Sequence, residues 1–280
     1  MKYFKRENWG FYTAATVIVF LFCLITIILL LNTFISSFKT NMDFFTHPWS
    51  LPSKVVFDNY VKMYSDGFLG YFRNSFILLA TAVTAVLGLS APAAYGLGRF
   101  KFSGNSKLRL FFMIGMFFPY QLGLIPLFNL IKAMGLMDSL LGVFLIYSAT
   151  ISMPVFILTN LTLTIPEELR ESARIDGAGE FKIFTSIFLP LMKPGFGALA
   201  PLLTANIWNE FFIPMVFIAS DKNKTVTLGL YRYFTSKGFD TSRIGVAFAC
   251  VCVSVFPLVL IYIFGSKNII SGMTLGSVKE

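Results

Sequence analysis

The most informative segment of this chain is Pro166-Glu167-Glu168-Leu169-Arg170-Glu171-Ser172-Ala173-Arg174-Ile175-Asp176-Gly177-Ala178-Gly179-Glu180-Phe181, which continues through Phe184 to Leu189-Pro190. It is the long charged segment between two hydrophobic runs, and acids dominate its first half. A glycine interrupts the helical pattern near the middle, and a proline closes the segment. This pattern predicts two short helices joined by a bend, held between two membrane-spanning helices.

Local signals define the two short helices. Pro166 suits a first helical position, where its missing N–H leaves no unpaired donor. Glu167 and Glu168 then fall in the first turn, where acids interact favourably with the positive end of the helix. Asp176 and Gly177 are predicted to end this helix, with Gly177 in a left-handed conformation and Asp176 as the N-cap of the next. The second helix carries an apolar stripe at helical spacing, made by Phe181, Phe184 and Phe188.

The composition is that of a membrane protein. Of 280 residues, 56% are hydrophobic and 13% charged, with a mean hydropathy of +0.72, whereas soluble domains carry about 25% charged residues. The net charge of +9 suits cytoplasmic loops that face anionic lipid. The basic residues are scattered over short loops and form no stripe, which argues against nucleic acid as a partner.

Six apolar runs are each long enough to span a bilayer. The predicted spans cover residues 11–34, 74–97, 110–131, 139–163, 195–220 and 244–264, and the charged loop covers residues 164–194. Pro119 and Pro126 interrupt the third run. The intervening polar segments are short, so residues 1–280 are predicted to form a single transmembrane domain. Lys and Arg are slightly more frequent on the side of the N-terminus, which predicts that both termini and the 164–194 loop are cytoplasmic.

Candidates for other chemistry are few. Cys23, Cys250 and Cys252 lie in apolar runs, where they are predicted to be packing residues and neither metal ligands nor disulfides. His47 stands alone in a loop. The sequence has no G-x-x-x-x-G-K-[ST] phosphate-binding loop, so we expect no cofactor in this chain, and ATP to be bound by another chain if it drives transport.

The 164–194 loop has the spacing E-x-x-x-x-D-G-A-x5-F-x5-P, and it resembles the EAA loop of permease subunits in binding-protein-dependent ABC importers. Ser172 stands where that family usually has alanine. The matching positions are Glu171, Asp176, Gly177, Ala178, Phe184 and Pro190.

The resemblance extends over nearly the whole chain. Tyr95 and Arg99 lie in a stretch similar to A-Y-x-x-x-R-F-x-F-x-G, and residues 119–121 and 125–127 are similar to the family's third span. Residues 208–211 read Trp-Asn-Glu-Phe, which resembles the family's W-N-[DE]-F. The tail, residues 275–279, resembles G-A-V-K-G with substitutions. These features are typical of carbohydrate permeases of the maltose-permease-G-like type.

The resemblance implies an all-α integral membrane protein with six transmembrane helices, the type I ABC importer permease fold and cytoplasmic EAA coupling helices. It also implies that the chain is no enzyme and forms half of a translocation pathway for sugars. The implied partners are a second permease subunit, two ATP-binding subunits, an extracytoplasmic solute-binding protein and membrane lipid.

The first site hypothesis concerns coupling to the ATPase. Glu171 and Asp176 would supply polar contacts, Gly177 the bend, and Ala173 and Ala178 close approach to the partner. The same resemblance adds Phe184 and Pro190 to the coupling residues. The alternatives are that Asp176 and Gly177 only shape a turn, or that the loop lies on lipid headgroups.

The second site hypothesis concerns the solute pathway. Glu210 is a charge inside an apolar run, and such a residue normally faces protein or water. Asn206, Asn209 and Glu210 have the i, i+3, i+4 spacing that places residues on one helix face, and their amides and carboxylate suit sugar hydroxyls. Gln121 and Asn160 are further candidates. The alternative is a polar contact between spans or with the second permease subunit.

Two other classes of function share single features with this sequence. Asp176-Gly177 begins the D-G-x-x-A-R pattern of a membrane-embedded alcohol phosphotransferase, but residues 178–181 do not continue it. That chemistry needs clustered carboxylates on metal ions, and no metal site is predicted here. An ion channel is the third possibility, although the chain has no filter-like segment.

Overall fold

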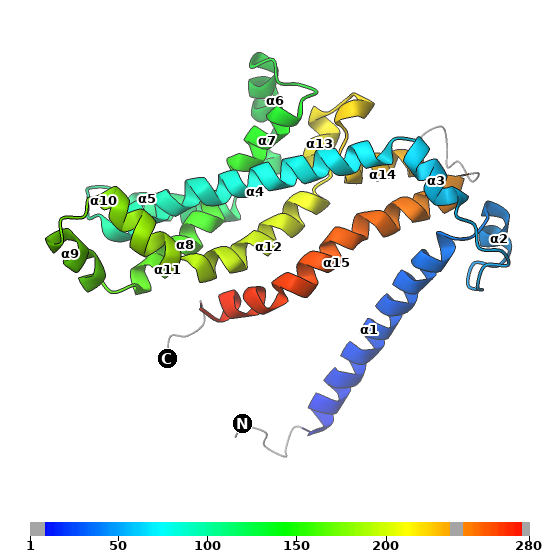
Figure 1. Cartoon of the computed structure of the whole chain (residues 1–280), viewed down its shortest axis with the longest axis horizontal. Coiled ribbons are helices and arrows are strands. Elements are labelled where there is room, and N and C mark those ends of the chain that lie inside the picture. The colour runs from blue at the N-terminus through cyan, green and yellow to red at the C-terminus, as the bar shows by residue number, and fades with distance from the viewer. Residues whose placement is uncertain (1–8, 236–242, 276–280) are drawn as a thin grey trace. The chain divides into compact units, whose positions relative to one another are not determined.

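The computed structural model describes residues 9–235 and 243–275, and every regular element in these residues is a helix (Figure 1). The chain forms two compact units. Unit 1 comprises the described parts of Met1–Phe68 and Leu230–Val255, and unit 2 comprises those of Leu69–Gly229 and Phe256–Glu280. The prediction of one domain over residues 1–280 stays a prediction.

Unit 1 contains a long apolar helix and a loop that is held in place by side-chain hydrogen bonds. Its helices are α1 (Trp9–Ser36), α2 (Asn41–Thr46), α3 (Asp58–Ser65), the end of α14 (Val226–Thr235) and the first part of α15 (Ile244–Leu275). The fully buried Lys39 follows α1, and its Nζ donates to the carbonyl oxygens of His47 and Pro48 at 2.9 and 3.0 Å. Asn59 donates to the carbonyl oxygens of Ser37 and Lys39, both at 2.9 Å. These bonds fix the loop between α1 and α3, because a buried ammonium needs acceptors.

Unit 2 holds both candidate sites. Its longest helix is α4 (Phe68–Arg99), followed by α5 (Asn105–Phe117), η2 (Tyr120–Gly123), α6 (Leu124–Ala133), α7 (Leu140–Ser148) and α8 (Ser152–Thr164). The 164–194 loop contains α9 (Glu168–Ile175), α10 (Glu180–Ile183), the π-helical turn η3 (Phe184–Phe188) and α11 (Leu189–Leu191). After it come α12 (Lys193–Asn209), α13 (Phe212–Phe217), η4 (Asp221–Asn223) and the start of α14.

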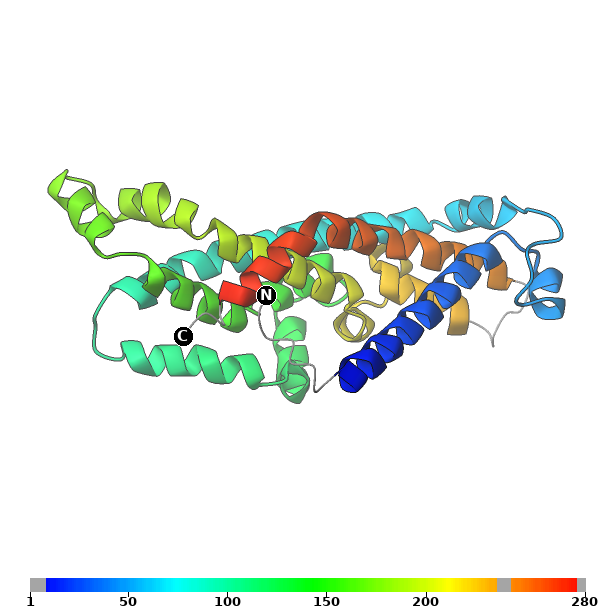
Figure 2. The ribbon, with the colours of Figure 1, turned by 90° about the horizontal axis from the view of Figure 1, so that it is seen from below.

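The core of unit 2 joins three of its long helices. Val86 of α4, Leu158 of α8 and Leu199 of α12 are almost completely buried in one hydrophobic cluster. In Figure 1, the α9–α10 pair lies at the same end of this bundle as the C-terminal end of α4, and the second view agrees (Figure 2). The 164–194 loop is therefore carried at one end of the packed helices.

Four helices are long and apolar enough to cross a membrane, judged by length and composition. They are Gly10–Ser36, Phe68–Arg99, Leu140–Thr164 and Ile244–Ile263. Two further pairs of helices pass the same test together but are bent, so the described residues offer six candidate spans when each bent pair is counted as one. The predicted all-helical membrane architecture is consistent with this count.

The bent pairs show where the predicted spans are interrupted. Asn105–Phe117 and Tyr120–Ala133 meet at 93°, and the break falls at Pro119, while Pro126 lies inside α6. Glu180–Leu191 and Lys193–Asn209 meet at 68°. The predicted helix over 195–220 also ends early, because the backbone of Glu210 is extended with ψ of 123°. In contrast, α15 continues to Leu275, beyond the predicted end at residue 264.

Asp138 connects the turn between α6 and α7 to the segment after α13 by hydrogen bonds. Oδ1 of Asp138 accepts hydrogen bonds from the N–H groups of Ala219 and Ser220 at 3.0 and 2.9 Å, and from the Ser220 hydroxyl at 3.0 Å. The N–H of Asp138 donates to the carbonyl oxygen of Phe217 at 2.8 Å. Asp138 has a φ of 53°, a left-handed conformation that aspartate tolerates better than most residues.

Candidate functional site

The first helix of the 164–194 loop begins later than predicted. Helix α9 starts at Glu168, Glu167 is its N-cap, and Pro166 lies outside the helix. Ile165 is extended, with ψ of 133°, as a residue before proline prefers to be. Glu168 and Glu171 occupy the first turn, where their charges interact favourably with the helix dipole.

The bend at Gly177 is a Schellman turn. Gly177 has a φ of +79°, its N–H donates to the carbonyl oxygen of Arg174 at 3.0 Å, and the N–H of Ala178 donates to that of Ala173 at 2.9 Å. These two bonds satisfy the last carbonyl groups of α9. Asp176 is the C-cap of α9, and Gly179 is the N-cap of α10. The prediction of Asp176 as an N-cap was therefore wrong, because the turn needs three residues before the next helix begins.

Ala173 and Ala178 do not lie at the tip of the loop. Both pack against a small core beneath it, formed by Tyr95, Ile165, Ile183 and Phe188. Schellman turns often bring together the residues at these two positions. The small side chains thus let α9 and α10 close over Tyr95, and their predicted close approach to a partner is untested.

The other predicted coupling residues fall into two groups. Phe184 is half-buried and packs on Tyr95, with ring centroids 5.3 Å apart. Pro190 lies in α11, just after the π-helical turn and just before the 68° bend. Glu171, Asp176 and Gly177 are exposed.

The tip of the loop also exposes large apolar side chains. Ile175 is 86% exposed and Phe181 is 80% exposed, on either side of the Gly177 turn. No residue of α9 is buried. The tip therefore presents apolar groups beside the carboxylates of Glu171 and Asp176.

Sequence reasoning missed a group of charged residues behind the tip. The guanidinium of Arg170 pairs with Glu167 at 2.7 Å and with Glu180 at 2.8 Å, and Arg99 at the end of α4 pairs with Glu167 at 2.8 Å. The hydrogen bonds to Glu180 raise the pKa of Arg170 above its ordinary value. The one sign of this group in the sequence was the i, i+3 spacing of Glu167 and Arg170, which allows an ion pair within a helix.

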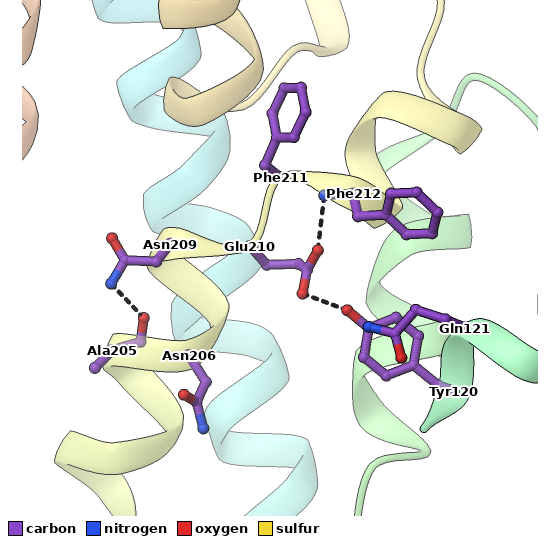
Figure 3. Close-up of a pocket in the computed structure, with 8 residues that line it drawn as sticks. All are labelled: Tyr120, Gln121, Ala205, Asn206, Asn209, Glu210, Phe211 and Phe212. Atoms are coloured by element: carbon purple, nitrogen blue, oxygen red, sulfur yellow. Dashed lines mark hydrogen bonds between the residues drawn. The ribbon is translucent and has the colours of Figure 1, made fainter. Parts of the chain in front are cut away.

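The predicted pathway residues line one open cavity of about 420 Å³ in unit 2 (Figure 3). It is lined by Tyr120, Gln121, Ala205, Asn206, Asn209, Glu210, Phe211 and Phe212. The predicted pathway residues Gln121, Asn206, Asn209 and Glu210 are all in this set. Asn160 is not, and it lines a smaller cavity of about 30 Å³ with Arg109 and Leu97.

The carboxylate of Glu210 lies between two helix breaks. Its Oε1 accepts from the N–H groups of Phe212 and Ile213 at 2.7 and 3.2 Å, which caps α13. Its Oε2 accepts from the hydroxyl of Tyr120 at 2.6 Å, next to the break at Pro119. Figure 3 shows the carboxylate reaching from the end of α12 toward Tyr120.

The amides are arranged differently from the prediction. Asn209 points away from Glu210 in Figure 3, and its amide donates to the carbonyl oxygen of Ala205 at 2.9 Å. The expectation of one helix face shared by Asn206, Asn209 and Glu210 was wrong, because α12 ends at Asn209. The three side chains still border the same cavity. Among the described residues, no cluster of three or more His, Cys, Asp or Glu is placed to hold a metal ion.

Comparison with known proteins identifies the family. The model of the binding-protein-dependent transport system inner membrane component matches residues 86–273. The arabinooligosaccharides transport system permease protein AraQ of Bacillus subtilis is 34% identical over 232 residues, which cover 81% of this chain and 80% of AraQ. The diacetylchitobiose uptake system permease protein NgcG of Streptomyces coelicolor is 31% identical over 264 residues, covering 94% of this chain and 87% of NgcG.

A solved structure has the same fold. One chain of a bacterial ABC transporter involved in the import of the acidic polysaccharide alginate superimposes with a TM-score of 0.84. The two chains share 22% identity over 95% of this chain and 99% of that chain. The prediction of an importer permease fold is thus confirmed, and the family match removes the enzyme alternative. The chain belongs to the binding-protein-dependent transport system inner membrane components, and it is a multi-pass inner-membrane permease of an ABC importer.

Proposed function

We propose that this permease imports an oligosaccharide, and that the 164–194 loop couples it to a separate ATP-hydrolysing subunit. In this proposal two ATP-binding subunits act from the cytoplasm, and a second permease subunit completes the pathway. A solute-binding protein delivers the sugar from outside. The names of the relatives AraQ and NgcG support an oligosaccharide as the solute.

The observation that carries the coupling role is the exposed tip of the loop. Ile175 and Phe181 are 86% and 80% exposed, although they lie beside charged residues and outside the predicted spans. Burying such side chains against a partner contributes roughly 1.5–3 kcal/mol each. The carboxylates of Glu171 and Asp176 frame this apolar pair and supply directional contacts. The tip therefore has the mixed character of a protein-binding surface and lacks the basic face of a headgroup-binding helix.

The Glu210 cavity supports the proposed solute. It combines a carboxylate and three amides with the rings of Tyr120, Phe211 and Phe212. Carboxylate and amide groups hydrogen-bond to hydroxyls, and aromatic rings cover the apolar C–H faces of a sugar ring. Polar groups that fix the orientation of a ligand beside aromatic rings that cover its apolar faces are usual in a small-molecule site.

The coupling role is tested in the complete importer reconstituted in vesicles with its ATPase, second permease and binding protein. Ile175→Asp places a charge at the apolar tip and is expected to abolish uptake with the fold retained. The matched control is Leu51→Asp, which places the same charge at an apolar residue that is 75% exposed in the loop between α2 and α3, outside the predicted spans. Wild-type uptake by Ile175→Asp would contradict the proposal.

The orientation of the loop is tested separately. Ser172→Cys, in a chain whose native cysteines are replaced by alanine, is treated with a membrane-impermeant maleimide. The proposal expects labelling in inverted vesicles and protection in intact spheroplasts. Labelling from outside the cell would place the loop beyond the reach of a cytoplasmic ATPase and would overturn the proposal.

The choice of solute is tested by uptake of radiolabelled sugars. A panel of neutral di- to pentasaccharides is offered with monosaccharides and amino acids as controls. Saturable uptake of an oligosaccharide that depends on ATP supports the proposal. Uptake restricted to a non-sugar solute would refute the substrate class and leave the coupling role standing.

A further inference from the structure

We propose that Arg170 locks the C-terminal end of α4 to the 164–194 loop, so that the ATPase moves α4 directly as well as the adjoining helices α8 and α12. Arg170 is thus a positioning residue for force transmission. The inference rests on the proposed coupling function of this loop. It concerns a helix that lies far from the loop in sequence, since Arg99 and Glu167 are 68 positions apart.

Arg170 contacts both carboxylates that flank it. Its Nη1 lies 2.7 Å from Oε1 of Glu167, its Nη2 lies 2.8 Å from Oε1 of Glu180, and its Nε donates to Oε2 of Glu180 at 3.3 Å. The two bonds to Glu180 form the forked geometry that makes arginine–carboxylate pairs directional. These contacts join α9 to the start of α10.

Each of the two carboxylates also bonds to α4. Glu167 accepts from Nη1 of Arg99 at 2.8 Å, and Glu180 accepts from the hydroxyl of Tyr95 at 2.7 Å. Tyr95 and Arg99 are four residues apart, so they lie on one face of α4. Two parallel bridges, Arg170–Glu167–Arg99 and Arg170–Glu180–Tyr95, therefore run from α9 to the last turn of α4.

Aromatic rings cover these bridges. The guanidinium of Arg99 lies 4.7 Å from the ring centroid of Phe188, and that of Arg170 lies 5.0 Å from the centroid of Phe100. The side chains of Arg99 and Arg170 are only 6% and 11% exposed, whereas those of Glu167 and Glu180 are 41% and 36% exposed. Fully exposed ion pairs are mobile and contribute little, whereas burial of the two guanidinium groups restricts these pairs to one geometry.

Arg99 also binds the end of α8. Its Nη2 donates to the carbonyl oxygens of Thr162 and Ile165, where α8 ends. The last turn of α4, the end of α8, α9 and α10 thus form one hydrogen-bonded block. Without the bridges, α9 would be held to unit 2 by the turns at Ile165 and Gly177 and by the apolar packing of Ala173, and no polar contact among the described residues would resist its sliding against α4.

The first test measures ATP hydrolysis and solute uptake together in the reconstituted importer. Arg170→Gln removes the charge and the fork but leaves the exposed tip unchanged. We expect hydrolysis stimulated by the loaded binding protein to stay within about twofold of wild type, and uptake to fall about tenfold, a typical coupling effect. The number of ATP molecules used per solute then rises.

Arg174→Gln is the matched control. Arg174 lies one turn further along α9, its side chain is 60% exposed, and it is 3.8 Å from Glu180. Its substitution is expected to leave the ratio of hydrolysis to uptake unchanged. A parallel loss of hydrolysis and uptake in Arg170→Gln, or an unchanged ratio, would refute the inference.

The second test measures motion and does not depend on a well-folded Arg170 variant. Spin labels are placed at the exposed positions Lys101 and Glu168, after α4 and at the start of α9, in an active chain without native cysteines. With Arg170 present, the distance between the labels should be the same before and after ATP binding. A change of that distance on ATP binding would show that α4 moves separately, and the inference would fail.

The two proposals fail differently. If Ile175→Asp imports at the wild-type rate, the proposed coupling function of the loop is refuted, whatever distance the spin labels report. If Ile175→Asp is inactive but the labels move apart in the active chain, the coupling function stands and only the Arg170 lock is wrong.

Discussion

The hydroxyl of Tyr120 donates a 2.6 Å hydrogen bond to Glu210, and this bond joins two places where a helix is interrupted. Tyr120 follows the 93° break at Pro119, and Glu210 separates α12 from α13. The other oxygen of the carboxylate caps α13 through the N–H groups of Phe212 and Ile213. Glu210 thus has a structural task at the place where we propose that it meets the solute.

The first prediction concerns this double task. Glu210→Ala removes the cap of α13 and the bond from Tyr120, and we expect it to lower stability by about 2 kcal/mol, from about 1 for the cap and about 1 for the second bond. Tyr120→Phe removes only the bond from Tyr120 and should lower stability by about 1 kcal/mol. Unfolding of the purified protein in detergent measures both. Asn209→Ala is the control, because the amide of Asn209 donates to the carbonyl oxygen of Ala205 in its own helix (Figure 3). The stability of this variant should be close to that of wild type. Equal stability of Glu210→Ala and wild type would contradict the capping role.

The second prediction concerns the left-handed residue in the loop. A Cβ at Gly177 would meet no atom within 4 Å, so only its φ of +79° opposes substitution. Gly177→Ala should therefore cost about 1–2 kcal/mol, and Gly177→Asn should cost less because asparagine tolerates this conformation. Gly179 also has open space but a φ of −72°. Gly179→Ala should be tolerated, and equal unfolding free energies for the two alanine variants would refute the strain argument.

The third prediction compares a crowded glycine with an open one. A Cβ at Gly142 in α7 would lie 2.4 Å from the carbonyl oxygen of Leu136, a backbone atom that cannot move aside easily. Gly142→Ala should destabilise by roughly 1–3 kcal/mol, as overpacking does. Gly88 in α4 has no atom within 4 Å of such a Cβ, and Gly88→Ala should stabilise by up to about 1 kcal/mol. The melting temperatures should move in opposite directions, and a shift of the same sign would count against this packing.

The fourth prediction is a pH dependence at Asp138. The backbone N–H of Ser220 lowers the pKa of this carboxyl below its ordinary value, and the Ser220 hydroxyl and the Ala219 N–H act in the same direction. A lowered pKa means that the contribution to stability is complete above the unfolded value of about 3.9 and is lost as the pH falls through the folded value. Asp138→Asn should therefore melt lower than wild type at pH 5–8.

The difference in melting temperature should shrink as the pH falls below about 4 toward the lowered folded pKa, because protonation removes the charge that the N–H groups stabilise. Asp58→Asn, an exposed change in α3, is the control and should run parallel to wild type. A deficit of Asp138→Asn that persists unchanged into acid would show that charge has no part in this turn.

Features set by local sequence could be predicted. The apolar runs of α1 and α4 are long and continuous, so their spanning helices follow from hydropathy alone. The bend at Gly177 follows from the need for a residue that tolerates left-handed angles. Pro119 predicts an interruption of the third apolar run, but the presence of a proline does not predict the 93° angle of the bend. The end of α12 could not be foreseen, because residues 211–214 stay apolar after Glu210 and hydropathy gives no information on the backbone conformation.

The candidate sites were only partly foreseeable for a different reason. Gln121, Asn206, Asn209 and Glu210 stand out in the sequence as polar residues in apolar runs, and they do border one cavity. The partners of Arg170 could not be chosen in this way. Glu180 bonds to Tyr95 across 85 positions of sequence, and nothing local in either stretch specifies that pair. Such contacts depend on how helices pack, which is a property of the whole chain.

The helix breaks at Pro119 and Glu210 also predict where water reaches the interior of unit 2. Non-helical backbone is tolerated at membrane depth only where it is enclosed by protein or borders a wet cavity, and the segments at Pro119 and Glu210 border an open one. Their amide protons should therefore exchange with deuterium much faster than those of the buried face of α4. A sugar that enters at this level would trade hydration for protein contacts gradually, without passing through bare hydrocarbon.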